Sequence, residues 1–149
     1  MHQLGSHLKR RTILMSTKRQ RIIGWVMTAL LEIMLIGLSG ISKFMEFPGK
    51  KEMLDRMGIS ADLLSRIGVV EIAVAILFLI PRTAFIGAIL ITAYLGGAIM
   101  THLRVGDPWI FPIILGVFMW VALGLRNPAI FSLALGKAPA GQTSEEVSR

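Results

Sequence analysis

The fold is decided by residues 68–108, which read GVVEIAVAILFLIPRTAFIGAILITAYLGGAIMTHLRVGDP. Two apolar runs in this stretch are separated only by the three residues PRT at positions 81–83. Because Pro81 ends the first run, and because so short a connection joins neighbouring antiparallel helices, the stretch predicts a tight helical hairpin. We expect its helices to cover about residues 61–80 and 83–104.

The composition indicates that lipid rather than water surrounds this hairpin. Of the 149 residues, 54% are hydrophobic, and the mean hydropathy is +0.67. Such a chain has too few polar residues to cover a soluble domain of its size. Two more apolar runs, over residues 22–44 and 108–126, flank the hairpin, and a spanning helix needs about 20 residues. The sequence therefore predicts an all-α, membrane-embedded antiparallel four-helix bundle.

A short helix is expected in the connection between spans 1 and 2. Pro48 suits a helix start and Gly58 a helix end. One apolar face between them is formed by Met53, Leu54 and Met57. This spacing predicts a short interfacial helix. Ser60 is expected to cap the second span, and Asp107 the fourth.

The two ends of the chain differ from its apolar middle. Residues 1–21 are basic and polar, and they are predicted to be a mostly disordered N-terminal extension in which Met15 is a second candidate start. Residues 22–128 form the predicted transmembrane domain. The first span is too long for the apolar core of a signal peptide, so we expect it to be retained. Residues 129–149 are predicted to be a flexible C-terminal tail.

The charges predict an orientation in the membrane. The formal net charge is +7, and Lys and Arg are more frequent on the side of the predicted bundle that holds both termini. The positive-inside rule then places both termini in the cytoplasm of a cell with a bacterial inner membrane. A nucleic-acid partner is not expected, because the basic residues flank an apolar span and carry no interleaved aromatic residues. The absence of cysteine excludes a dithiol mechanism in this chain.

Ionisable side chains inside the predicted spans identify a candidate site. A charge at the centre of a spanning helix costs about 2.5–3.5 kcal/mol on insertion scales, so Glu71 needs a reason to be there. The residues expected to surround it in the outer half of the membrane are Lys43, Tyr94, His102 and Arg104. Polar residues of the first span recur at helical spacing, which predicts one polar stripe. This stripe consists of Thr28, Glu32, Ser39, Lys43 and Glu46.

Two interpretations of the cluster stay open. In the functional one, it lines a pocket that holds a quinone headgroup, a lipid headgroup or a proton. In the structural one, Glu71 pairs with Lys43 or Arg104 only to fix the packing of the helices. Glu32 has no evident partner at its depth, so its role is open. The single histidine of the spans cannot assemble a metal site alone, and no metal ligand or catalytic residue is assigned.

The small residues of the third span suggest a packing role. A four-residue spacing relates Ala93, Gly97 and Thr101. Small residues at this spacing let helix backbones approach closely in lipid. We therefore expect this stripe to lie at a tight contact between two helices.

Several stretches of the chain together resemble the DoxX-like family of small four-helix membrane proteins. These stretches are GLSGISKF (37–44), RIGVVEI (66–72), PRTAFIGAILITAYLGGAIMTHLRVGDP (81–108) and LRNP (125–128). The resemblance covers about residues 22–128. It implies that the recurrent polar residues of the family fall on Lys43, Glu71, His102, Arg104 and Asp107. Glu32 is not among them.

The resemblance also implies a link to quinone chemistry. The namesake of the family is a membrane subunit linked to thiosulfate:quinone oxidoreduction, and relatives are membrane partners of redox or oxidative-stress proteins, although many members have no assigned reaction. The resulting hypothesis is a quinone- or lipid-binding accessory subunit without autonomous catalysis, with quinone as the candidate cofactor. The alternative is a structural or assembly module. A membrane enzyme with Glu71 and His102 as acid and base is a third hypothesis, for which the sequence supplies no motif. Association into a homo-oligomer is left open.

Overall fold

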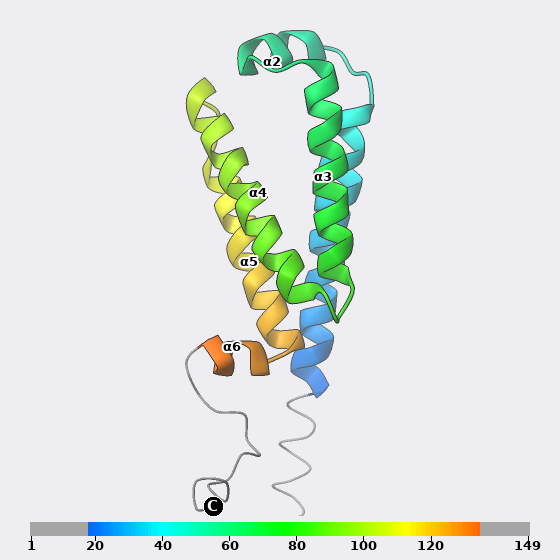
Figure 1. The fold of residues 1–149 in the computed structure, drawn as a ribbon, viewed down its shortest axis with the longest axis vertical. Coiled ribbons are helices and arrows are strands. Elements are labelled where there is room, and N and C mark those ends of the chain that lie inside the picture. Colours follow the sequence, from blue (N-terminus) through cyan, green and yellow to red (C-terminus); the bar gives the residue numbers. More distant parts are fainter. Residues whose placement is uncertain (1–17, 135–149) are drawn as a thin grey trace, which may run out of the picture.

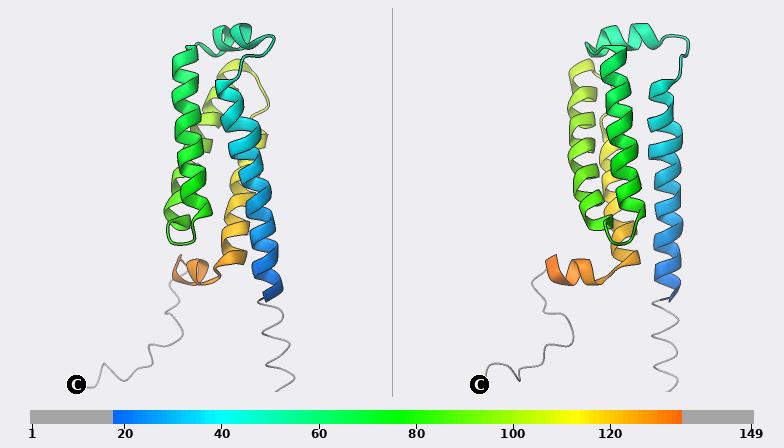
Figure 2. Two further views of the ribbon diagram at one scale, coloured as in Figure 1. Left: turned by 90° about the vertical axis from the view of Figure 1, so that its right-hand side faces the viewer. Right: turned by 45° about the vertical axis from the view of Figure 1, so that its right-hand side comes forward.

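The computed structural model describes residues 18–134, and every regular element among them is a helix, which confirms the all-α prediction (Figure 1). The long elements are the first helix (Lys18–Phe44), α3 (Ala61–Leu79), α4 (Ala84–Val105) and α5 (Ile110–Arg126). They lie side by side, and the described chain begins and ends at the same end of the molecule (Figures 1 and 2). The predicted hairpin is formed by α3 and α4, which are joined at one end and diverge toward the other.

Short helices cover the two ends of the molecule. At the end where α3 and α4 diverge lies α2 (Lys50–Met57), and at the opposite end lies α6 (Ala129–Ala134) (Figure 1). The helix α2 confirms the short helix predicted between spans 1 and 2. It ends as expected at Gly58, whose backbone lies in the left-handed region with a φ of 67°. By contrast, α6 lies in the segment predicted to be a flexible tail.

The ends of the described chain depart from the predicted boundaries. Residues 18–21, which fall within the predicted N-terminal extension, are helical and continue into the first helix. The remainder of the predicted extension, with Met15, and the remainder of the predicted tail lie outside the described residues. The division of the chain at residues 21 and 128 stays a prediction.

The first helix changes its hydrogen-bonding pattern along its length. Residues 18–32 are α-helical, η1 (Ile33–Gly40) is a π-helix, and η2 (Ile41–Phe44) is a 3₁₀-helix. Sequence periodicity gave no sign of this change. A Cβ atom at Gly40 would lie 2.8 Å from the Leu35 carbonyl oxygen, so the local backbone suits glycine. Irregular turns of this kind are frequent at functional sites.

Of the two predicted helix caps, the structure confirms one and contradicts the other. The Ser60 hydroxyl accepts a hydrogen bond of 3.1 Å from the Leu63 amide at the start of α3, which confirms that cap. The prediction for Asp107 is wrong, because α5 begins at Ile110, too far along the chain for Asp107 to cap it. The Asp107 carboxylate instead accepts a hydrogen bond of 3.0 Å from Arg56.

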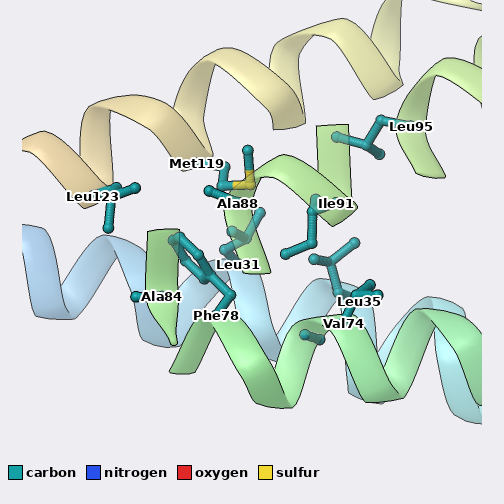
Figure 3. Close-up of a cluster of buried hydrophobic side chains, with 11 residues drawn as sticks. Leu31, Leu35, Val74, Phe78, Ala84, Ala88, Ile91, Leu95, Met119 and Leu123 are labelled. Atoms are coloured by element: carbon teal, nitrogen blue, oxygen red, sulfur yellow. The ribbon is translucent and has the colours of Figure 1, made fainter. Parts of the chain in front are cut away.

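The apolar core lies where the four long helices meet, around the buried ring of Phe78 (Figure 3). A Cβ atom at Gly87 would overlap the Phe78 backbone, so this glycine lets α3 and α4 pack closely near their connection. Other core side chains are Leu31, Leu35, Val74, Ala88, Ile91, Leu95, Met119 and Leu123.

The outer surface of the long helices is apolar, as expected of a membrane protein. The first helix and α4 are long and apolar enough to cross a membrane, and only 28% of the most apolar window of each is buried. Central helices of a soluble protein would be mostly buried. Large exposed apolar side chains occur on all four long helices and include Ile22, Leu30, Leu38, Val69, Ile76, Ile86, Met100 and Val117.

Candidate functional site

The predicted acid of the second span is paired with a lysine of the first helix. Lys43 Nζ lies 2.6 Å from Glu71 Oε2, and the two side chains are 15% and 2% exposed. Glycines bring the two backbones close enough for this pair, because a Cβ atom at Gly68 would lie 2.9 Å from the Phe44 ring and 3.2 Å from the Gly40 carbonyl oxygen. Of the two partners considered for Glu71, the structure selects Lys43.

Two further side chains complete a network around this ion pair. Besides Glu71, Lys43 Nζ donates to the Ser39 hydroxyl at 2.8 Å and to the Ser39 carbonyl at 3.1 Å, which uses all three donors of the ammonium group. The Tyr94 side chain lies beside this pair and interacts electrostatically with Glu71. We call Ser39, Lys43, Glu71 and Tyr94 the Lys43 network. It joins the first helix, α3 and α4.

A cavity of about 670 Å³ adjoins the Lys43 network. Its volume is in the range of sites that bury a small organic ligand. The polar part of its wall consists of Ser39, Ser42, Lys43, Arg66, Glu71, Tyr94, Thr101 and His102. Most of the remaining wall is apolar and includes Met34, Met53, Met57, Leu64, Ile67, Phe111 and Leu115. The cavity therefore combines an apolar interior with one polar side.

The small residues of α4 create this space and do not close it. Ala93, Gly97 and Thr101 all line the cavity, and a Cβ atom at Gly97 would meet no atom within 4 Å. The prediction that this stripe forms a tight helix contact is therefore wrong. The reason is that α3 and α4 diverge toward α2, so the small side chains leave the gap unfilled (Figure 1).

His102 lines the cavity and faces an acid on its other side. Its Nδ1 lies 4.0 Å from Asp107 Oδ2 and has no hydrogen-bond partner among the described residues. Arg56 of α2 donates to the same carboxylate. An acid near Nδ1 favours a proton on that nitrogen and leaves Nε2 free to act as acceptor. The sequence indicated His102 and Asp107 but not Arg56, whose position on a polar helix predicts only exposure.

Arg104 is not part of this arrangement. It is exposed in the last turn of α4 and does not line the cavity. Its guanidinium lies near the end of α2, where a Cβ atom at Gly58 would be 3.8 Å from Arg104 Nη2. The structure thus brings together Lys43, Glu71, Tyr94 and His102, and it leaves Arg104 outside.

Glu32 has a partner that the sequence did not indicate. It is 7% exposed, interacts electrostatically with Arg126 and has no hydrogen bond to either carboxylate oxygen among the described residues. Arg126, also 7% exposed, donates to the Phe78 carbonyl at 3.1 Å. Its guanidinium lies 4.6 Å from the centre of the Trp25 ring and 4.7 Å from that of Phe78. The sequence did not single out Arg126 as a partner for a buried acid.

Of the polar stripe predicted for the first helix, four residues are buried or half-buried, whereas Glu46 is exposed and lies beyond the end of the helix. Glu32 interacts with Arg126 of α5, Lys43 contacts Glu71 of α3, and exposed Glu46 pairs with Lys50 at 2.8 Å. The π-helix η1 lies between Glu32 and Lys43 and holds more residues per turn than an α-helix, so a spacing counted for an α-helix does not hold across it.

Comparison with known proteins gave one match. A family model described as the DoxX-like family matches residues 26–122, which is well over half of the chain and includes the cavity residues on the four long helices. No curated protein and no solved structure matches the chain.

Proposed function

The chain belongs to the DoxX-like family, and from this premise we propose that it is a multi-pass membrane protein that binds a quinone headgroup as an accessory to a redox partner. The observation that carries the proposal is the cavity of about 670 Å³ beside the Lys43 network. It offers an apolar interior for a ring and a polar wall for the oxygen atoms of that ring.

The four long helices form an antiparallel bundle across the bacterial inner membrane, with both termini in the cytoplasm. The exposed apolar side chains on every long helix and the excess of Lys and Arg near the termini support this arrangement. In α3, which carries three charged residues, Glu71 is neutralised by Lys43 inside the bundle, and Asp62 and Arg66 lie near the helix end. The cavity then lies in the outer half of the membrane.

The charge balance of the cavity favours a neutral headgroup over a phosphate. Lys43 is fully engaged by Glu71 and Ser39, and Arg66, the other basic residue of the wall besides His102, pairs with Asp62 at 2.9 Å. A phosphate would have to compete with these carboxylates for its cations. Ser42 and Thr101 already donate their hydroxyl protons to backbone carbonyls, so they offer only acceptors, as His102 Nε2 does, and these acceptors suit the hydroxyls of a quinol. The Ser39 and Tyr94 hydroxyls are the donors that remain for the carbonyl oxygens of a quinone.

A binding titration tests this function. The full chain in lipid nanodiscs is titrated with ubiquinone-1, and binding is followed by native mass spectrometry. We expect His102→Ala to lower the affinity at least tenfold and to leave the unfolding temperature within a few degrees. Arg104→Ala is the matched control, because Arg104 is a polar residue of the same helix turn outside the cavity, and it should bind like the unchanged chain. If the unchanged chain does not bind ubiquinone-1, the proposed function is wrong.

The second candidate function is a structural or assembly module. The full use of the Lys43 donors within the protein favours it, because such a network needs no ligand to be satisfied. In that case Glu71→Gln and His102→Ala lower the unfolding temperature and partner recovery together, and native mass spectrometry detects no quinone on the unchanged chain.

A further inference from the structure

Exposed residues line the cavity at Phe47, at Phe111 and at several positions of α3 and α4. On α3 these are Leu63, Arg66 and Val70, and on α4 they are Ala93 and Gly97. Leu63 is 44% exposed and Val70 is 53% exposed, although both border the cavity. A residue that borders a cavity and the outer surface at once marks an opening between them.

These residues lie along the contact between two neighbouring helices. The divergence of α3 from α4 separates their halves near α2 (Figure 1). Leu63 and Arg66 of α3 and Gly97 of α4 belong to these halves by their position in the helices, and Val70 lies at the middle of α3. Each helix places an exposed cavity residue close to a buried residue. On α3, Val70 directly precedes buried Glu71, and on α4, Gly97 lies two positions after buried Leu95. The opening therefore points sideways between the helices.

We infer that a membrane amphiphile enters the cavity sideways between α3 and α4 and that its apolar chain stays in this opening. This inference rests on the proposed function and names the class of ligand: a small oxygen-bearing ring on a long isoprenoid chain, delivered from the bilayer and not from water. The rim is apolar except for Arg66, which is paired with Asp62, so a hydrocarbon chain passes it without desolvating a free charge.

Gly97 sets the width of the opening. A Cβ atom at this position would meet no atom within 4 Å, so any side chain would extend into the free space between the helices. The neighbouring Gly96 is equally exposed and equally free of contacts, but it does not line the cavity. The pair provides a matched comparison at adjacent positions of one helix.

Cysteine labelling tests the opening, because the chain contains no cysteine and a single introduced thiol is unique. Gly97→Cys and Gly96→Cys are folded into nanodiscs and then labelled with fluorescein maleimide. We expect the label at position 97 to lower the affinity for ubiquinone-8 at least tenfold and the label at position 96 to leave it within twofold. Bound ubiquinone-8 should slow labelling at position 97 only, and ubiquinone-0, which has no chain, should not.

The outcomes separate this inference from the function on which it rests. Equal binding of ubiquinone-8 by both labelled variants overturns the opening and leaves quinone binding intact. Equal protection of position 97 by ubiquinone-0 and ubiquinone-8 overturns the placement of the chain. Binding of neither quinone by the unlabelled full-length protein overturns the proposed function and this inference together.

Discussion

The two ends of the bundle each bury an acid with a base, but only one of them encloses a cavity. Near α2, Lys43 and Glu71 form a fully bonded pair beside about 670 Å³ of space. Near α6, Glu32 and Arg126 are equally buried, yet polar atoms of both have no partner among the described residues. Buried charge and ligand space are therefore separate properties of this fold.

The backbone spacing explains the difference. A Cβ atom at Gly24 would lie 2.8 Å from the Arg126 amide nitrogen, so the first helix and α5 are in close contact at the Glu32 end. At the other end, a Cβ atom at Gly97 would meet nothing within 4 Å. Divergence of the helices therefore makes the cavity, and the Lys43 network supplies the polar side of its wall.

The largest effect is expected from breaking the bonded pair. Lys43→Met leaves the Glu71 carboxylate buried without a counter-charge, and loss of one member of a buried pair costs about 3–5 kcal/mol. We expect a fall of this size in the free energy of unfolding, measured by denaturant titration of the full chain in mixed micelles. The double substitution Lys43→Met with Glu71→Leu should recover most of it, because no buried charge remains. A double variant no more stable than Lys43→Met would show that the charge is not the cause.

A smaller effect is expected from adding one methyl group at each end. Gly24→Ala introduces an atom against the α5 backbone, and overpacking of this kind costs about 1–3 kcal/mol. Gly97→Ala, in the middle of α4, should be neutral or stabilising by up to about 1 kcal/mol, because alanine favours the helix and finds free space there. The same denaturant titration compares the two. Equal losses of stability in the two variants would contradict the difference in helix spacing between the two ends of the bundle.

Much of the fold follows from the sequence because it depends on local signals. Pro81 and the short connection after it predict the α3–α4 hairpin, Gly58 predicts the end of α2, and Ser60 predicts the start of α3. Each of these effects acts within a few residues of the signal. Glu71 was also identified from the sequence, because the cost of a charge among apolar residues holds whatever the partner is.

The rest depends on how whole helices are placed. The π-helix η1 changes the number of residues per turn between Glu32 and Lys43, and a constant helical period cannot represent such a change. The small residues around Gly97 suit a tight contact and an open cavity equally well, so only the divergence of α3 and α4 decides between them. Arg126 was missed because a basic residue at a span end is usually a flank, whereas here its guanidinium packs against two aromatic rings.

The smallest effect on stability is expected at the edge of the cavity, where α2 meets the connection between α4 and α5. Arg56 donates to Asp107 at 3.0 Å, but its side chain is 56% exposed, and exposed pairs contribute about 0.2–1 kcal/mol. Arg56→Ala should lower the free energy of unfolding by no more than this, and 1 M salt should reduce the difference. Lys51→Ala, on the exposed side of α2, is the control for loss of a positive charge. Since Asp107 also lies near His102, Arg56→Ala should weaken ubiquinone-1 binding more than it weakens folding. Loss of stability without loss of binding would show that α2 only covers this end of the bundle and does not help to orient His102.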